Sequence, residues 1–307
     1  MKMTVASCQF PVSSNIQRNK DYIVKQIKMA TEKGADVAHF PEAALSGYAG
    51  VDMPSYEGFD WDLLKNCTIE ILNCAREAGI WVVLGTTHQL SGCHKPHNSL
   101  YIINSKGELI DRYDKMFCAG DATEQTGDLA HYSAGDHFCT FEIKGIVCGT
   151  QICHDYRYPE LYREYKKKGV QVMFHSYHAA NVGTERLEAM QSVVGEKYKK
   201  YNSGMTMTFP GITMPATMTS YAANNFMWIS ASNSSAKESC WASFFVRADG
   251  ITIGRLSRNV AGVLVTEIDT EDDLYDSTVA WRNRSINGIY HSGTLVKDER
   301  SIDRKSF

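Results

Sequence analysis

The chain has 307 residues, of which 43% are hydrophobic and 22% charged, and its formal net charge is −3. This is the composition of an ordinary globular protein that is long enough to bury a sizeable core. The slight acidic excess and the absence of a long basic run argue against a nucleic-acid partner. No stretch approaches the ~18 consecutive apolar residues of a membrane-spanning helix, so we expect no membrane association.

Nine cysteines are an odd count, and they lack the density of a disulfide scaffold. The apolar run at the N-terminus is too short for a signal peptide, so we expect reduced thiols in a cytoplasmic protein. A zinc site is a poor explanation because no pair of cysteines shows Cys-x2-Cys spacing. The nearest grouping is Cys93-His94 with His97, whose intervening Lys-Pro indicates a surface loop.

Hydrophobic periodicity, caps and turns predict interleaved strands and helices in the first half of the chain. In chain order these are a strand at 3–10, a helix capped by Asn19 and ended by Gly34, a strand at 36–40, a helix at 61–78, a strand at 81–87, and a hairpin of 100–103 with 109–113.

The second half continues the same alternation after a polar loop at 118–136. In chain order we predict strands at 137–143 and 145–152, a helix at 158–168, a strand at 170–174, helices at 184–200 and 214–224 separated by a loop at 202–211, a strand at 227–232, a hairpin of 243–248 with 252–256, and a last strand at 262–268. A polar tail over 270–307 is expected to wrap the surface or a partner. The pattern predicts one α/β domain with two mixed sheets and helices outside.

Reactive side chains follow four of these strands, namely Glu42, Lys115, Cys153 and His175. Functional groups of α/β sheets gather beyond the carboxyl ends of strands. Glu42 could activate the Cys153 thiol as a base, and Lys115 with a backbone N–H could stabilise the negative charge that develops on attack. The residues alone leave non-catalytic roles open: Glu42 could be a solvated glutamate, Lys115 a surface lysine and Cys153 a core thiol.

Three motifs in register then point to a family. They are Phe40-Pro41-Glu42-Ala-Ala-Leu-Ser46-Gly47-Tyr48, Tyr113-Asp114-Lys115-Met-Phe and Ile152-Cys153-His154-Asp155-Tyr-Arg157-Tyr158-Pro159-Glu160. Their order and settings resemble the nitrilase superfamily, the carbon–nitrogen hydrolases, from the first strand to about residue 268. The resemblance implies one domain over 1–307, with its core at about 3–268 and a surface or interface tail at about 270–307. It also implies an α-β-β-α sandwich, a homodimer or higher homo-oligomer, and no metal or organic cofactor.

The resemblance assigns roles to the motif residues. Glu42 would be the general base, Lys115 the cation beside the tetrahedral intermediate, and Cys153 the nucleophile that becomes a thioester. The backbone N–H of His154 would complete the oxyanion site. Many members carry a second glutamate near the substrate, and here the matching position is Asp128 or Glu124.

The pair that follows the cysteine, His154-Asp155, resembles the amidase and carbamoylase side of the superfamily. We therefore expect hydrolysis of an amide or N-carbamoyl bond in a small molecule, with release of ammonia or an amine. Alternatives are a catalytically silent binding or scaffold protein, an amide or acyl transferase, and a nitrile hydrolase. A segment at 195–213 resembles an insertion near the pocket. The expected substrate contacts are Tyr48, Tyr156, His175 and His178.

Overall fold

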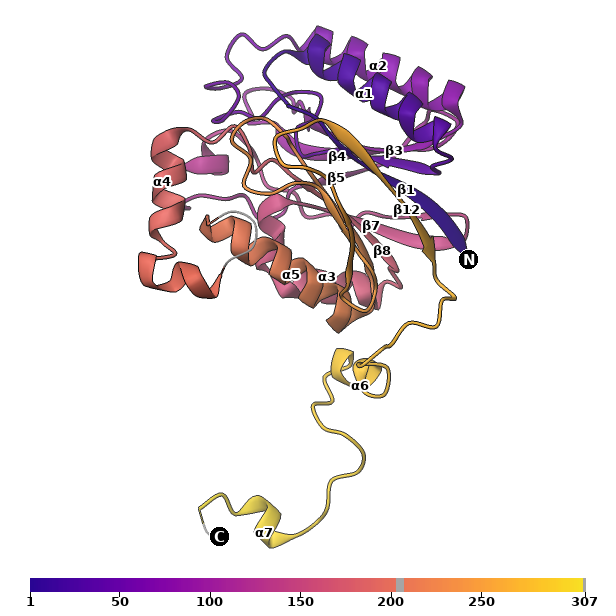
Figure 1. Cartoon of the computed structure of the whole chain (residues 1–307), viewed down its shortest axis with the longest axis vertical. Helices are drawn as coiled ribbons and strands as arrows, with labels where there is room; N and C mark the ends of the chain where they lie inside the picture. The colour runs from indigo at the N-terminus through magenta and orange to yellow at the C-terminus, as the bar shows by residue number, and fades with distance from the viewer. Residues whose placement is uncertain (203–206, 306–307) are drawn as a thin grey trace.

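Two six-stranded sheets lie face to face, and helices cover their outer faces (Figure 1). The structure is a computed structural model that describes residues 1–202 and 207–305. The helices α1 and α2 cover the first sheet, whereas α3 and α5 cover the second. The expected α-β-β-α sandwich is confirmed.

The first sheet has the strand order β12-β1-β2-β3-β4-β5. Its strands are β1 (Lys2–Gln9), β2 (Val37–His39), β3 (Trp81–His88), β4 (His97–Ile103), β5 (Leu109–Asp114) and β12 (Gly262–Asp269). The central strands β1, β2 and β3 are parallel, and the other neighbours pair antiparallel. Parallel strands buried between helices and a second sheet explain the near-continuous apolar runs in their sequences.

The second sheet has the order β11-β10-β9-β8-β7-β6 and repeats this plan. Its strands are β6 (Thr140–Ile143), β7 (Ile146–Ile152), β8 (Val172–Tyr177), β9 (Trp228–Asn233), β10 (Phe244–Val246) and β11 (Thr252–Arg255). Again the three middle strands, β7, β8 and β9, are parallel. The two sheets therefore bring the carboxyl ends of several parallel strands to a common region.

The helices begin and end largely where caps predict. Their bounds are α1 (Ile16–Glu32), α2 (Trp61–Ala78), α3 (Pro159–Lys167), α4 (Thr184–Ser192), α5 (Phe209–Asn225), α6 (Arg282–Ile286) and α7 (Glu299–Ile302), with 3-10 turns η1 (Gly127–Ala130), η2 (Cys153–Arg157) and η3 (Glu196–Tyr201). The predicted helix at 61–78 is confirmed, with Asp60 as its cap and Gly79 in the left-handed conformation behind it.

The predicted cap of the first helix is wrong. Asn15 caps α1 by accepting a hydrogen bond from the Arg18 backbone N–H at 2.9 Å. Asn19 lies one turn inside the helix, where it is buried and donates to the backbone carbonyl oxygens of Ser13 and Leu45. Its amide thus anchors the loop around Leu45, a role that spacing alone does not reveal.

The region after β8 departs most from prediction. The helix expected at 184–200 stops at Ser192, and Gly195, with φ +72°, separates it from η3. The loop expected at 202–211 ends early, because Thr208 caps α5 and Pro210 sits in its first turn. Residues 203–206 of that loop, and of the expected insertion at 195–213, lie outside the described residues.

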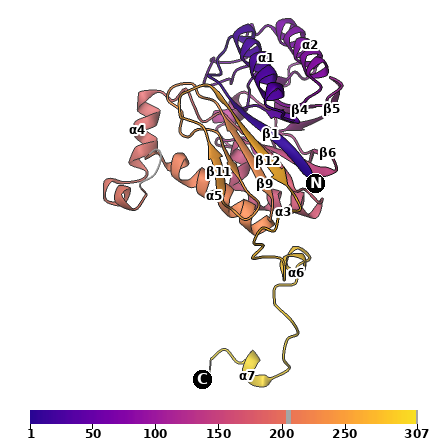
Figure 2. The same ribbon diagram turned by 45° about the vertical axis from the view of Figure 1, so that its right-hand side comes forward.

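The residues after β12 leave the body of the molecule as a C-terminal arm, residues 270–305 (Figures 1 and 2). Its first part still contacts the body, because Leu274 packs against the core between the sheets and the Arg282 guanidinium lies over the Phe226 ring, 5.6 Å from its centroid. The rest, with α7, extends away from both sheets, so the structure shows a surface contact for the start of the arm only. A partner for it remains a prediction. Among the described residues, no helix has the length and apolarity that crossing a bilayer requires.

Candidate active site

The three expected catalytic side chains meet at the strand ends. Glu42 follows β2 and Lys115 follows β5 in the first sheet, whereas Cys153 follows β7 in the second. Lys115 and Cys153 line one cavity of about 530 Å³. The Glu42 carboxylate lies beside it and accepts a hydrogen bond from Lys115. The sequence predicted this convergence correctly because each residue directly follows its strand.

Glu42 is fully buried, and three donors fix its carboxylate. Lys115 Nζ and Asn98 Nδ2 each donate to Oε1 at 2.8 Å, and the backbone N–H of His178 donates to Oε2 at 2.9 Å. Charge-assisted hydrogen bonds of this kind hold a carboxylate in one orientation. Residues in or directly after β4, β5 and β8 therefore fix the orientation of the Glu42 carboxylate.

Lys115 is paired with a second carboxylate. Its Nζ lies 2.7 Å from Asp128 Oδ2, and Asp128 also accepts hydrogen bonds from the Tyr48 hydroxyl and the Ala119 backbone N–H. Burial opposes the charge of Lys115, but the Asp128 and Glu42 carboxylates raise its pKa well above the usual range. The lysine is therefore a permanent cation.

Asp128, and not Glu124, is the acid beside the lysine. Glu124 is exposed, does not line the cavity, and its backbone N–H donates to Asp121. Burial acts to raise the pKa of Asp128, but Lys115 outweighs it and lowers that pKa. The shorter side chain reaches the lysine because η1 carries Asp128 inward.

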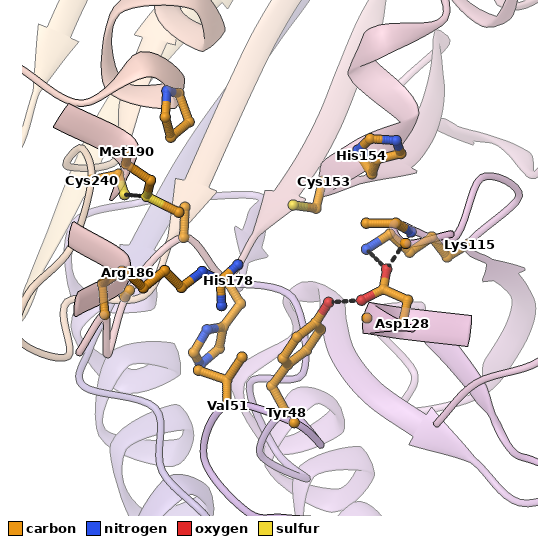
Figure 3. A pocket seen from close by; sticks show the side chains of 18 of the residues that line it. Tyr48, Val51, Lys115, Asp128, Cys153, His154, His178, Arg186, Met190 and Cys240 are labelled. Atoms are coloured by element: carbon orange, nitrogen blue, oxygen red, sulfur yellow. Dashed lines mark hydrogen bonds and ion pairs between the residues drawn. The ribbon is translucent and has the colours of Figure 1, made fainter. Parts of the chain in front are cut away.

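Cys153 occupies a strained elbow. Its φ is +42°, in the left-handed region that residues other than glycine rarely adopt, at a cost of about 1–3 kcal/mol. The turn points the sulfur into the cavity between Lys115 and His178 (Figure 3). Burial raises the pKa of the thiol well above its usual range, and the charge of the Glu42 carboxylate adds to this rise. These effects favour a neutral thiol beside the Glu42 carboxylate.

His154 is the second residue of η2, directly after Cys153, where backbone N–H groups have no partner within the helical turn. Burial, followed by the charge of Lys115, lowers the pKa of its imidazole. The N–H of His154 and the Lys115 ammonium can therefore face an oxygen bonded to the carbon that Cys153 attacks.

His175 does not contact the cavity, and its predicted loop position is wrong. It lies inside β8, fully buried, with Nδ1 2.9 Å from the Tyr162 hydroxyl and Nε2 3.2 Å from the Cys153 carbonyl oxygen. Burial lowers its pKa to about 3, so the ring is neutral. His175 thus stabilises the turn at Cys153 through its contact with the Cys153 carbonyl oxygen.

The other expected contacts, Tyr48, Tyr156 and His178, do line the cavity. His178 stacks on the Tyr48 ring with centroids 5.3 Å apart, and its Nε2 lies 2.9 Å from Asp52 Oδ2. Although burial opposes it, Asp52 raises the pKa of His178, which favours the imidazolium. The rest of the wall is largely apolar and includes Val182, Met190 and Trp241.

The sequence does not reveal the residues that orient the site from distant positions in the chain. Asn98 reaches Glu42 across 56 positions, and Asp52 reaches His178 across 126. Neither stands in a motif. The one available signal was a polar Asn98 at an inward position of an otherwise apolar strand.

One group of described side chains could hold a metal ion, and it lies outside the cavity. Asp111, His137 and Cys139 place their ligand atoms within 4.8 Å of one another. The His137 Nε2 already bonds to Asp111 at 3.0 Å. The chemistry of the cavity does not involve these residues.

Comparison with known proteins agrees with this geometry. The family model described as "Carbon-nitrogen hydrolase" matches residues 4–272. The chain is 28% identical to an omega-amidase of Xenopus laevis over 178 residues, which cover 56% of this chain and 62% of that one. It is 26% identical to a 2-oxoglutaramate amidase of Bacillus subtilis over 179 residues, covering 57% and 64%. The matched part thus spans about three-fifths of these relatives.

The fold has close neighbours among solved structures. An amidase from Nesterenkonia sp. superposes with a TM-score of 0.67 at 21% identity, covering 87% of this chain and 90% of that one. At this identity the likeness concerns the fold. The match of the family model over nearly the whole sandwich is independent of it, and it contains Glu42, Lys115 and Cys153. The chain belongs to the carbon–nitrogen hydrolase family.

Proposed function

We propose that this protein hydrolyses an amide of a small molecule, with Cys153 as nucleophile, Glu42 as general base and acid, and Lys115 and the His154 N–H as the oxyanion site. The observation that carries the proposal is the buried cluster of Glu42, Lys115 and Cys153, in which Glu42 accepts a hydrogen bond from Lys115 and its charge raises the pKa of the Cys153 thiol. A neutral thiol beside a fixed carboxylate can be deprotonated as it attacks.

In the first half-reaction the sulfur attacks the amide carbon while Glu42 accepts the thiol proton. The carbonyl oxygen becomes negative, and Lys115 with the His154 N–H stabilises it. Glu42 then returns the proton to the departing nitrogen. Ammonia leaves and a thioester remains on Cys153.

In the second half-reaction water replaces ammonia. Glu42 takes a proton from the water, which attacks the thioester carbon, and the same two donors stabilise the oxyanion. The proton returns to the sulfur, and the acid leaves. One amide and one water thus give one carboxylic acid and one ammonia.

The relatives support an amide over the alternatives. The matched curated proteins include an omega-amidase and a 2-oxoglutaramate amidase. In one structure of the Nesterenkonia amidase, the acetamide moiety of fluoroacetamide is covalently added at the active-site cysteine. An N-carbamoyl substrate would use the same steps. A cytoplasmic location stays a prediction, to which nine free cysteines lend support.

The test is ammonia release from a panel of primary amides and N-carbamoyl compounds. We expect Cys153→Ala to lower kcat/KM by about 10³-fold or more, because it removes the nucleophile. Cys118→Ala is the matched control, since this half-buried thiol does not line the cavity. Intact mass should show an acyl adduct on the wild type and none on Cys153→Ala. Undiminished turnover by Cys153→Ala would refute the mechanism, and a wild type that never acylates would favour a binding protein.

A further inference from the structure

Asp155 is a fully buried carboxylate that the proposed chemistry does not use. It lies in η2, two residues after the nucleophile, and it does not line the cavity. Three donors converge on it: the Tyr113 hydroxyl at 2.7 Å and the Ile152 backbone N–H at 3.1 Å bond to Oδ2, and the Phe117 backbone N–H bonds to Oδ1 at 2.8 Å. Two of these donors come from the first sheet and the turn after it, and the third comes from the second sheet.

The first two donors lie on either side of Lys115. Tyr113 is near the end of β5, two residues before the lysine, and Phe117 is two residues after it. Both donate to the same carboxylate, so the turn that carries Lys115 is fixed at both of its ends. The strand β5 is the edge strand of its sheet and pairs with β4. A turn that leaves an edge strand is held by its own sheet from one side, and Asp155 adds a constraint from the second sheet.

The third donor lies directly before the nucleophile. Ile152 is the last residue of β7, so its hydrogen bond to Asp155 closes a short loop around Cys153. Cys153 has a φ of +42°, and a residue keeps such a conformation only where its surroundings determine it. The bond between Ile152 and Asp155 is one such constraint, and the contact of the Cys153 carbonyl oxygen with His175 is another.

We infer that Asp155 is a positioning residue that fixes Lys115 relative to Cys153 across the two sheets. This inference rests on the proposed amide hydrolysis, in which Lys115 must lie about 3 Å from the oxygen that becomes negative when Cys153 attacks. An ionised carboxylate suits the task because it is an acceptor only and can satisfy all three donors at once. Small displacements of catalytic groups have large effects, since about 1 Å can lower a rate about a hundredfold.

The substitution Asp155→Asn tests the inference because an amide can accept from only part of this set. If its oxygen takes the place of Oδ2, Phe117 loses its bond and the turn with Lys115 is released. If the oxygen takes the place of Oδ1, the amide NH2 faces the Ile152 N–H and the loop around Cys153 is released. We expect kcat for an amide to fall about tenfold to a hundredfold, with KM changed by less than about threefold. The assay is run at pH 8, because burial raises the pKa of Asp155 to about 6.

Two further variants separate positioning from stability. Tyr113→Phe keeps the carboxylate and both backbone bonds, so we expect kcat to fall about threefold to tenfold in a protein that folds. Asp36→Asn is the matched control, because that carboxylate accepts a backbone bond from Thr4 at 2.9 Å at the amino end of β2, away from the site. It should lower the melting temperature and keep kcat. An unchanged kcat in folded Asp155→Asn, or an equal fall in Asp36→Asn, overturns the inference. If Asp155→Asn does not fold, an unchanged kcat in Tyr113→Phe overturns it.

The inference and the proposed function fail separately. If the wild type hydrolyses no amide, the rate at which iodoacetamide alkylates Cys153 decides the inference. Burial and the Glu42 charge raise the pKa of this thiol, and the charge of Lys115 counteracts them, so a displaced lysine leaves less thiolate to react. Peptide mass spectrometry separates Cys153 from the exposed Cys93, which is the internal control. Slower alkylation of Cys153 in Asp155→Asn, with an unchanged rate at Cys93, supports the inference, and an unchanged rate at Cys153 overturns it.

Discussion

Lys115 carries the positive charge that compensates the Glu42 and Asp128 carboxylates. A fully buried ammonium would be expensive alone, and here two carboxylates within hydrogen-bond distance compensate it. The two acids are not equivalent, because Glu42 has the larger effect on the pKa of the Cys153 thiol, whereas Asp128 is hydrogen-bonded to Tyr48 and the Ala119 backbone. Asp128 thus fixes the lysine so that Glu42 remains available to exchange protons.

This division of roles predicts the effect of Asp128→Asn. Removing the charge 2.7 Å from Lys115 Nζ would let the lysine bind Glu42 more tightly and make that carboxylate a weaker base. We expect kcat/KM for an amide to fall about tenfold to a hundredfold, which is about 1.4–2.8 kcal/mol of barrier. Glu124→Gln is the control and should keep wild-type kinetics. Equal losses from both variants would show that the loop, and not the Asp128 charge, matters.

The sequence could predict the triad but not what orients it. Glu42, Lys115 and Cys153 stand in local motifs directly after strands, so their meeting follows from the class of fold. Asp52 and Asn98 act through pairs that only the folded chain forms, and no local pattern marks them.

At the scale of elements, the two sheets are joined by a buried polar seam as well as by an apolar core. On β2, His39 Nδ1 lies 2.8 Å from the Ser230 hydroxyl and its Nε2 2.9 Å from the Ser176 hydroxyl. Ser230 also meets Ser7 at 2.6 Å. A neutral imidazole donates through one nitrogen and accepts through the other, which suits two hydroxyl partners. The seam fixes β2, and with it the turn that carries Glu42.

This seam makes stability depend on pH in a definite direction. Burial lowers the pKa of both His39 and His175 to about 3, against about 6.5 when unfolded. Each therefore contributes stability that is full above pH 6.5 and lost as pH falls toward 3, by about 1.4 kcal/mol per pH unit. Burial raises the pKa of Asp155 to about 6, so this carboxyl group adds stability as pH falls from 6 to 4. Together these three groups give a net loss of about 1.4 kcal/mol per unit there.

Urea unfolding at pH 6, 5 and 4 measures this slope. His39→Gln removes one of the two histidines and keeps a donor and an acceptor for the serine hydroxyls. We expect the variant to be less stable than wild type at pH 7, and its loss of stability from pH 6 to 4 to be smaller than that of wild type by about 1.4 kcal/mol per unit. A variant that keeps the wild-type slope would show that His39 is not the group that titrates.

The elements that sequence predicted best are those with apolar runs and unambiguous caps. The helix at 61–78 has Asp60 before it and Gly79 behind it, and both bounds are correct. The first helix has two asparagines near its start, four positions apart, and the apolar stripe that follows Asn19 is the more regular, so periodicity favours Asn19 although Asn15 is the cap. The expected helix at 184–200 failed because α4 buries no side chain, so nothing in its periodicity could locate its end.

At the scale of the whole molecule, the body and the C-terminal arm differ in how they bury apolar side chains. The body has three apolar cores, one between the sheets and one under each helical layer. Apart from Leu274, which packs against the core between the sheets, the arm leaves most of its large apolar side chains in water. Their exposed fractions are 81% for Tyr275, 86% for Tyr290, 66% for Leu295, 71% for Val296 and 76% for Ile302. Such a segment gains little from folding on its own chain and is suited to another surface.

We therefore expect the arm to hold copies of this chain together. Sedimentation equilibrium on the full chain should show a homodimer or larger assembly. A chain ending at residue 269 should show a smaller species with the same melting transition, because β12 closes the first sheet before the arm begins. The double substitution Leu295→Ser and Val296→Ser tests the apolar contact without shortening the chain, and it should weaken association since each side chain contributes about 1.5–3 kcal/mol when fully buried. An assembly of unchanged size after truncation would place the interface on the body, and the exposed side chains of the arm would then need another partner.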